Sequence, residues 1–367
     1  MRRLRGEAPS RPRTPVLSKL VLVQVLRAAA ALSVAMLHAQ HDAATLAERG
    51  AQAFTPIEAF PWEAGVDVFF VISGFIMVHA SAPLFGTEGA GRIFLARRIA
   101  RIVPVYWAVT TLYLAIALAV PALLNAELLG WGHVVASYLF IPTARPDGNV
   151  QPLYGLGWTL NYEMFFYILF AVAVAWPRRR AVPALAAVLI GLVAVGLLLR
   201  PLPQPLGFWT DPIVLEFVYG MALGYFHAKG IRLGPVARAL LGGAAILALI
   251  AVASRLGIWT IPYRALAYGL PAAMLVAAVA LGRERRNEGR LANIGAAVGD
   301  ASYALYLIHP FAIRAGREVV WRSGLGGVIG PWTFVVLALA ASVLAAVVVY
   351  RLFERPATAW VRARLKT

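Results

Sequence analysis

The sequence predicts an all-α polytopic membrane protein, a bundle of about ten transmembrane helices. Hydrophobic residues make up 60% of the 367 residues and charged residues only 14%, whereas a soluble globular chain carries roughly 25% charged residues. This much apolar surface cannot be buried in one soluble core, so lipid must cover it. The apolar residues are also gathered into runs long enough to span a bilayer. The lipid bilayer is therefore the first predicted partner.

Runs of about 20 apolar residues predict helices, because backbone polar groups in lipid must be satisfied within the segment. Ten such segments are expected, at residues 17–39, 63–80, 102–124, 157–176, 181–199, 211–228, 236–254, 263–282, 300–316 and 331–353. Residues 131–142 are apolar but too short to span, which predicts an interfacial or re-entrant piece. The predicted domains are a basic tail at 1–16, a transmembrane domain at 17–353 and a second basic tail at 354–367.

The distribution of charge favours cytoplasmic locations for both termini. With the N-terminus inside and the helices alternating, 25 of the 34 Lys and Arg residues fall on the cytoplasmic side and 8 on the other. This positive-inside pattern predicts a bacterial inner-membrane protein, and it explains the net charge of +17 without a nucleic-acid partner. The chain has no cysteine, which excludes a disulfide, a thiolate nucleophile and a cysteine metal site. We expect no metal centre.

Ionisable residues inside the predicted helices are functional candidates, because their burial in lipid is costly. Arg27 and His38 lie eleven residues apart on the first helix, on nearly the same face and about 16 Å apart along its axis. Asp67 and Glu163 lie near the outer starts of the second and fourth helices, and His309 lies in the ninth. We expect the histidines and carboxylates to share one layer. A histidine held by a carboxylate is a workable general base.

Structural roles for the same residues remain open at this point. Arg27 can extend its charged end toward the membrane surface or pair with Asp67, and an acid such as Asp67 is favoured in the first turn of a helix. A lone histidine near a helix end is typical of an interfacial residue, a description that fits His41, His79, His133 and His227. Composition and spacing therefore do not name a reaction.

Five motifs in order carry a resemblance to a known family. They lie at residues 26–38, 65–75, 97–107, 158–167 and 299–310. The first contains a basic residue, ten intervening positions and a histidine, and the fourth reads Trp-Thr-Leu-Asn-Tyr-Glu. Together they resemble the acyltransferase family 3 membrane proteins over essentially the whole chain. The runs Trp-Thr-Leu-Asn-Tyr-Glu-Met and Tyr-Leu-Ile-His-Pro are most similar to the exopolysaccharide-production branch.

The resemblance implies an enzyme that moves an acyl group, usually acetyl, from cytoplasmic acyl-CoA to a sugar hydroxyl. The implied partners are acyl-CoA, with acetyl-CoA as the usual co-substrate, and a cell-surface or lipid-linked saccharide. No other cofactor is implied. The cytoplasmic arginines suit the phosphates of CoA, because guanidinium groups bind phosphate bidentately. The implied acyl-CoA-binding residues are Arg27, Arg97, Arg98 and Arg101.

The implied catalytic residues are His38, Glu163 and Asp67. His38 takes the proton of the acceptor hydroxyl as general base, and Glu163 or Asp67 orients it. A nearby donor then stabilises the tetrahedral oxyanion. Possible acceptor or oxyanion contacts are Ser73, Trp158 and His309.

Two other functions remain as alternatives. A transporter or flippase for a lipid-linked saccharide can use buried charges for binding or proton coupling, but it has no evident need for a phosphate-binding arginine motif. A non-catalytic assembly subunit of a polysaccharide machine is the other alternative, and the retention of every polar motif position argues against it.

Overall fold

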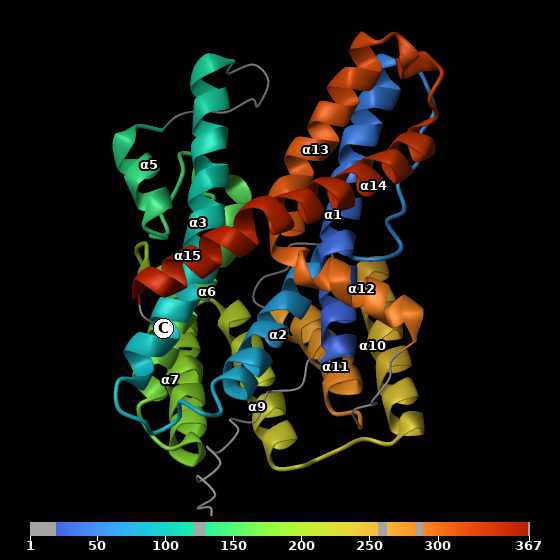
Figure 1. Ribbon diagram of the computed structural model, residues 1–367. Helices are drawn as coiled ribbons and strands as arrows, with labels where there is room; N and C mark the ends of the chain where they lie inside the picture. Colours follow the sequence, from blue (N-terminus) through green and yellow to red (C-terminus); the bar gives the residue numbers. More distant parts are fainter. Residues whose placement is uncertain (1–19, 121–128, 256–262, 284–288, 366–367) are drawn as a thin grey trace, which may run out of the picture.

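The computed structural model describes residues 20–120, 129–255, 263–283 and 289–365, and its regular structure is helical almost throughout (Figure 1). The exception in these ranges is an isolated β-bridge between Ala144 and Val150. The predicted all-α class is confirmed. The expected tail at residues 1–16 lies outside the described residues.

Among the described residues, seven helical segments are long and apolar enough to cross a membrane. An eighth is a pair of helices, α12 (Arg290–Asp300) and α13 (Ser302–Arg322), bent by 71°. The predicted polytopic architecture is therefore confirmed. The seven segments are α1 (Val21–Arg49), η1 (Trp62–Ala64) with α2 (Gly65–Ala80), α3 (Ala90–Ala119), η2 (Gly155–Gly157) with α6 (Trp158–Ala173), α7 (Arg178–Leu198), α10 (Pro235–Arg255), and the run of α14 (Pro331–Val349), η6 (Tyr350–Glu354) and α15 (Arg355–Leu365).

Two of the ten expected segments are shorter helices than a full span requires. The expected helix at 211–228 is η3 (Pro212–Val214) followed by α9 (Leu215–Ala228). The expected helix at 263–282 is η4 (Ala265–Gly269), one π-helical turn, followed by α11 (Leu270–Ala280). Both pack against α2, so their backbones are covered by protein over much of their length. The orientation of the termini stays a prediction.

The first helix runs beyond its expected end at residue 39, to Arg49. The reason is that polar residues past this point find partners inside the protein. Gln40 accepts a hydrogen bond from the backbone N–H of Ile57 at 2.6 Å, and Asp42 is paired with an arginine of α13, Arg317. In Figure 1, α1 and α13 run side by side.

The short segments and the C-terminal region complete the fold. Within residues 131–142, α5 (Trp131–Tyr138) is an eight-residue helix, as expected for a piece too short to span. A further short helix, α8 (Leu206–Trp209), precedes η3, and η5 (Leu325–Gly327) precedes α14. The expected tail at 354–367 is helical as far as Leu365, and this helix, α15, lies across α3 (Figure 1). The π-helical turn η6 directs Glu354 inward, where it is only 1% exposed.

Candidate active site

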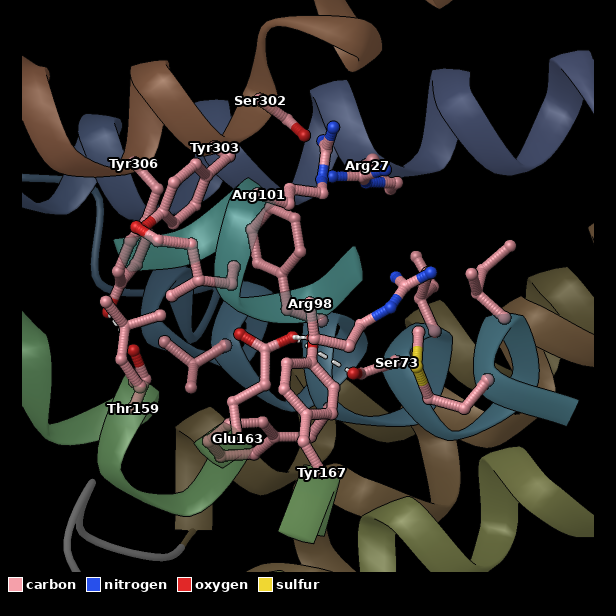
Figure 2. A pocket seen from close by; sticks show the side chains of 18 residues that line it. Arg27, Ser73, Arg98, Arg101, Thr159, Glu163, Tyr167, Ser302, Tyr303 and Tyr306 are labelled. Carbon is pink, nitrogen blue, oxygen red and sulfur yellow. Dashed lines mark hydrogen bonds between the residues drawn. The ribbon is translucent and has the colours of Figure 1, made fainter. Parts of the chain in front are cut away.

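Helices α1, α2, α3, α6 and α13 enclose a cavity of about 100 Å³, which we call the arginine cavity (Figure 2). Three guanidinium side chains reach it from two helices. Arg27 comes from α1, and Arg98 and Arg101 come from α3, where a spacing of three residues places them on one helix face. Its other polar lining residues are Ser73, Thr159, Glu163, Tyr167, Ser302, Tyr303 and Tyr306.

A carboxylate is held in place on the wall of this cavity that α6 forms. Glu163 Oε1 accepts a hydrogen bond from Ser73 Oγ at 3.0 Å and another from the hydroxyl of Tyr167, one helical turn further along α6. Figure 2 shows Ser73, Arg98 and Glu163 gathered on this side. Glu163 therefore belongs with the arginines, and the structure does not bring it to His38.

The arginines exceed the acids in and around the arginine cavity. Arg101 Nη1 lies 3.7 Å from Glu354 Oε1, a long separation for an ion pair. Arg98 Nε is buried without a hydrogen-bond partner among the described residues, and its guanidinium group lies 5.6 Å from the ring of Phe94. The excess positive charge makes this a site suited to a polyanion such as a phosphate group. Arg97 does not line the cavity.

A second and larger cavity, of about 480 Å³, contains His38, and we call it the histidine cavity. It shares two lining residues, Val66 and Tyr306, with the arginine cavity. The two cavities therefore adjoin, and α1 contributes to both through Arg27 and His38. The histidine cavity is lined on other sides by aromatic and polar residues, including Tyr113, Gln151, Tyr154, Trp158, Arg264, Phe311 and Arg314.

The ring of His38 faces the ring of His309, with 5.2 Å between the ring centroids. His309 is fully buried, and its Nδ1 lies 3.0 Å from the carbonyl oxygen of Leu305. Because a carbonyl only accepts, Nδ1 carries the proton and Nε2 is the nitrogen with a free lone pair. Nε2 has no hydrogen-bond partner among the described residues. It is thus available to accept a hydrogen bond from His38.

Asp67 is paired with an arginine and not with either histidine. Its oxygens accept two hydrogen bonds from Arg264, at 3.0 Å from Nε and 2.8 Å from Nη2. This bidentate pair is buried, and the fully buried Glu216 of α9 lies against it. The expected layer of two histidines and two carboxylates is therefore not found. The histidines meet, Asp67 faces Arg264, and Glu163 faces the arginine cavity.

The predicted contact residues are divided between the two cavities. Ser73 donates to Glu163 in the arginine cavity, whereas Trp158 lines the histidine cavity with Arg264, whose guanidinium carbon lies 6.0 Å from the Trp158 ring. Sequence reasoning missed Arg264 and Glu216, although both stand within predicted helices. The signal that could have found them is the one that found Asp67, an ionisable residue in an apolar run.

The fold and site define a multi-pass helical membrane protein in which an arginine-lined cavity adjoins a cavity lined by His38, whose ring faces that of His309. A family model described as an acyltransferase domain matches residues 22–351. The chain belongs to acyltransferase family 3 and is an acyltransferase, as its motifs predict. It is 37% identical over 305 residues to the exopolysaccharide production protein ExoZ of Rhizobium meliloti (strain 1021), a match covering 83% of this chain and 92% of ExoZ. No solved structure matches the chain.

Proposed function

We propose that the chain transfers an acyl group, with acetyl as the first candidate, from cytoplasmic acyl-CoA to a hydroxyl of a cell-surface or lipid-linked saccharide. The bacterial inner membrane is the proposed location. The observation that carries the proposal is that the two cavities are neighbours, because Val66 and Tyr306 line both of them. An arginine-lined site for the donor there adjoins a histidine-bearing site for the acceptor. The similarity to ExoZ supports an exopolysaccharide, or its lipid-linked precursor, as the acceptor.

The arginine cavity is the proposed site for the phosphates of CoA. Arg27, Arg98 and Arg101 converge there, and guanidinium groups form strong, charge-assisted hydrogen bonds with phosphate. Glu163 offsets part of their charge and is fixed by Ser73. The rise of a helix places Arg27 about 16 Å from His38 along the axis of α1. This separation is of the same order as an extended pantetheine arm, so the thioester can reach His38 while the nucleotide stays with the arginines.

His38 is the proposed general base for the acceptor hydroxyl. In this mechanism one ring nitrogen of His38 accepts the hydroxyl proton, while the other donates its N–H to Nε2 of His309. The acceptor oxygen bonds to the thioester carbon, the carbon–sulfur bond breaks, and CoA leaves as a thiol with the proton that His38 took. His309 is a positioning residue here, in the place that a carboxylate usually fills. Its Nδ1 hydrogen bond to Leu305 fixes the tautomer that this role requires.

The oxyanion of the tetrahedral intermediate needs an oriented donor. Arg264 lines the histidine cavity, and its bidentate pair with Asp67 fixes the direction of its guanidinium group. We therefore assign stabilisation of the oxyanion to Arg264. Asp67 is assigned the role of positioning the Arg264 guanidinium group. Trp158, on the same cavity wall, is the proposed surface for the acceptor sugar.

Label transfer tests the proposal. Purified protein in liposomes is incubated with acetyl-CoA labelled in its acetyl group and with extracted lipid-linked saccharides. We expect the label to appear on the saccharide and to be released by mild base, as an ester would be. Movement of saccharide across the vesicle membrane without any acetylation would instead indicate a carrier.

A further inference from the structure

Arg314 is a cation of the histidine cavity without a counter-charge. It lines the cavity from α13 and forms no ion pair or hydrogen bond with any residue that the structure describes. Its neighbours on the same helix are paired. Arg317 lies 2.7 Å from Asp42, and Arg322 lies 3.8 Å from Glu318. Of the three arginines on this helix, only Arg314, which lines the cavity, therefore has no ion pair among the described residues.

The acids near the cavity are already engaged by other groups. Glu63 is the acidic residue of its lining, and it accepts a hydrogen bond from the hydroxyl of Tyr268 at 3.1 Å. The guanidinium group of Arg264, which forms the ion pair with Asp67, also attracts the carboxylate of Glu63. Arg264 and Tyr268 thus engage these carboxylates, and neither carboxylate is paired with Arg314 among the described residues.

Membrane topology does not account for this charge. Arg314 stands at the end of its helix that the charge pattern predicts to be external, the side on which Lys and Arg are depleted. A cation within the membrane region is costly and is retained where it binds something. The remaining walls of the cavity are largely aromatic, with Tyr154, Trp158 and Phe311 among them. A few charged groups in a mostly apolar pocket are the groups that fix the orientation and specificity of its ligand.

The position of Arg314 relates it to the reacting hydroxyl. It follows His309 by five residues on α13, about 7.5 Å along the helix axis, and it lies within electrostatic range of His38. Because Arg314 and His38 line the same cavity, an anion bound by Arg314 would share that cavity with a hydroxyl held at His38, on the same sugar or on the next group of the acceptor.

We propose that Arg314 is an anion-binding subsite for the acceptor, so that the preferred acceptor is a saccharide carrying a carboxylate or phosphate near the acylated hydroxyl. The inference rests on the proposed function, whose acceptor class it narrows. The guanidinium group of Arg314 binds either anion by paired, charge-assisted hydrogen bonds. The negative charge can come from an acidic sugar or from the diphosphate of a lipid carrier, and both have the chemistry that Arg314 recognises.

The test compares three acceptors with the same neutral oligosaccharide core: the core alone, the core with a uronic acid, and the core on a polyprenyl diphosphate. Transfer of labelled acetyl and binding of each acceptor are measured separately for the wild type, Arg314→Gln and Arg322→Gln. We expect the wild type to prefer one of the charged acceptors, and the preferred one identifies the source of the anion. Arg314→Gln should lower kcat/KM for that acceptor about 10- to 100-fold, the range of a charge-assisted hydrogen bond, and should lower kcat/KM for the neutral core much less.

Arg322→Gln is the matched control, because it removes an arginine of the same helix whose side chain is 78% exposed and lies outside the cavity. It should behave as the wild type does. Arg314→Lys keeps the charge and should retain part of the preference, which separates charge recognition from a folding defect. Equal losses for all three acceptors in Arg314→Gln, or a wild type that binds charged and neutral acceptors equally, would overturn the inference. Charge-selective, Arg314-dependent binding without any acetyl transfer would support the subsite and count against the proposed function alone.

Discussion

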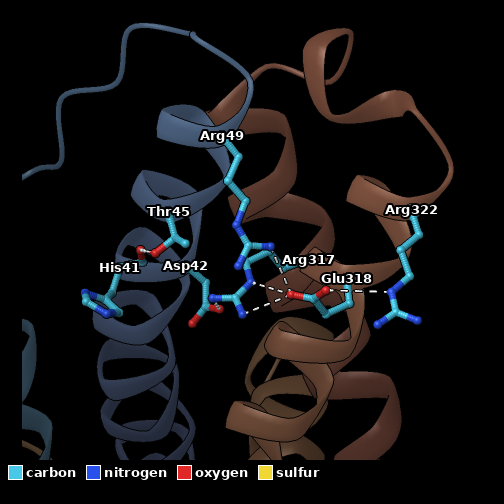
Figure 3. A network of polar contacts seen from close by, with 7 residues as sticks. All are labelled: His41, Asp42, Thr45, Arg49, Arg317, Glu318 and Arg322. Atoms are coloured by element: carbon cyan, nitrogen blue, oxygen red, sulfur yellow. Dashed lines mark hydrogen bonds and ion pairs between the residues drawn. The ribbon is translucent and has the colours of Figure 1, made fainter. Parts of the chain in front are cut away.

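Arg317 of α13 forms an ion pair with Asp42 of α1, with 2.7 Å between Nη1 and Oδ1 (Figure 3). Asp42 lies one helical turn beyond His38, and Arg317 lies about two turns beyond His309. The pair therefore fixes the axial position of the two helices that carry the facing histidines. Arg317 is held from its other side by Glu318, at 3.1 Å, which Arg49 of α1 also contacts.

Asp42→Asn should destabilise the protein and slow acyl transfer. Both side chains are about 90% buried, and the loss of a hydrogen bond between charged groups costs about 1.5–3 kcal/mol. Thermal unfolding and the transfer rate are the measurements. Glu48→Gln is the control, because Glu48 is an exposed acid of the same helix, and it should change neither quantity. If Asp42→Asn has wild-type stability and rate, the pair does not set the register of α1 and α13.

Labelling of single cysteines should give the orientation of the chain in the membrane. The sequence has no cysteine, so one introduced thiol gives an unambiguous signal. Cysteine at Glu58 or Asp147, both exposed, should react with a membrane-impermeant reagent from outside the cell. Cysteine at Arg179 should react only after lysis, because basic residues are retained in the cytoplasm. The reverse pattern would invert the topology and move the arginine cavity away from cytoplasmic acyl-CoA.

Arg98→Ala or Arg101→Ala should weaken acyl-CoA binding by about 1.5–3 kcal/mol each, the range for hydrogen bonds to charged groups. Arg97→Ala is an internal control, since Arg97 is adjacent in sequence but does not line the arginine cavity. Its effect on affinity should be smaller. Calorimetric titration with acetyl-CoA measures all three. Equal losses in the three variants would show that the net charge of this helix end matters and the cavity does not.

The apolar runs predicted the class of fold and the place of most helices, because lipid demands long helices with satisfied backbones. They could not predict which side chains meet. Asp67 and Arg264 are 197 positions apart, and hydropathy does not fix the rotation of either helix about its axis. Arg27 and His38 were predictable as a pair because they share one helix. Glu163 was expected beside His38, but its partners Ser73 and Tyr167 hold it in the other cavity.

Asp67→Asn should lower kcat while leaving acyl-CoA affinity unchanged. The substitution removes the negative charge that orients Arg264, and loss of one oxyanion donor typically costs 10²–10³ in kcat. Arg264→Lys keeps the positive charge but loses the bidentate geometry, and it should show a similar loss. Initial rates at saturating donor, together with donor binding, separate this effect from misfolding. A normal kcat in Asp67→Asn would remove both residues from the mechanism.

The histidine pair gives the last prediction, because its two members have different roles in the proposed mechanism. A general base contributes 10²–10⁴-fold in rate, so His38→Ala should nearly abolish transfer. Its acyl-CoA binding should persist, because the arginines line the other cavity. His309→Ala should cost less, since it leaves the base present but without the acceptor that orients it. His309→Gln offers an amide oxygen near the position of Nε2 and should recover part of the loss.

Transfer rates and acyl-CoA binding of the three variants, measured at matched expression, distinguish these roles. A merely structural His309 would lose activity in both of its variants in proportion to stability, without rescue by glutamine. If His309→Ala is the more damaging substitution, the proposed division of roles between the two histidines is wrong. If His38→Ala keeps more than about a tenth of the wild-type rate, the loss falls short of what removal of a general base causes. The proton of the acceptor hydroxyl would then have to leave by a group other than His38.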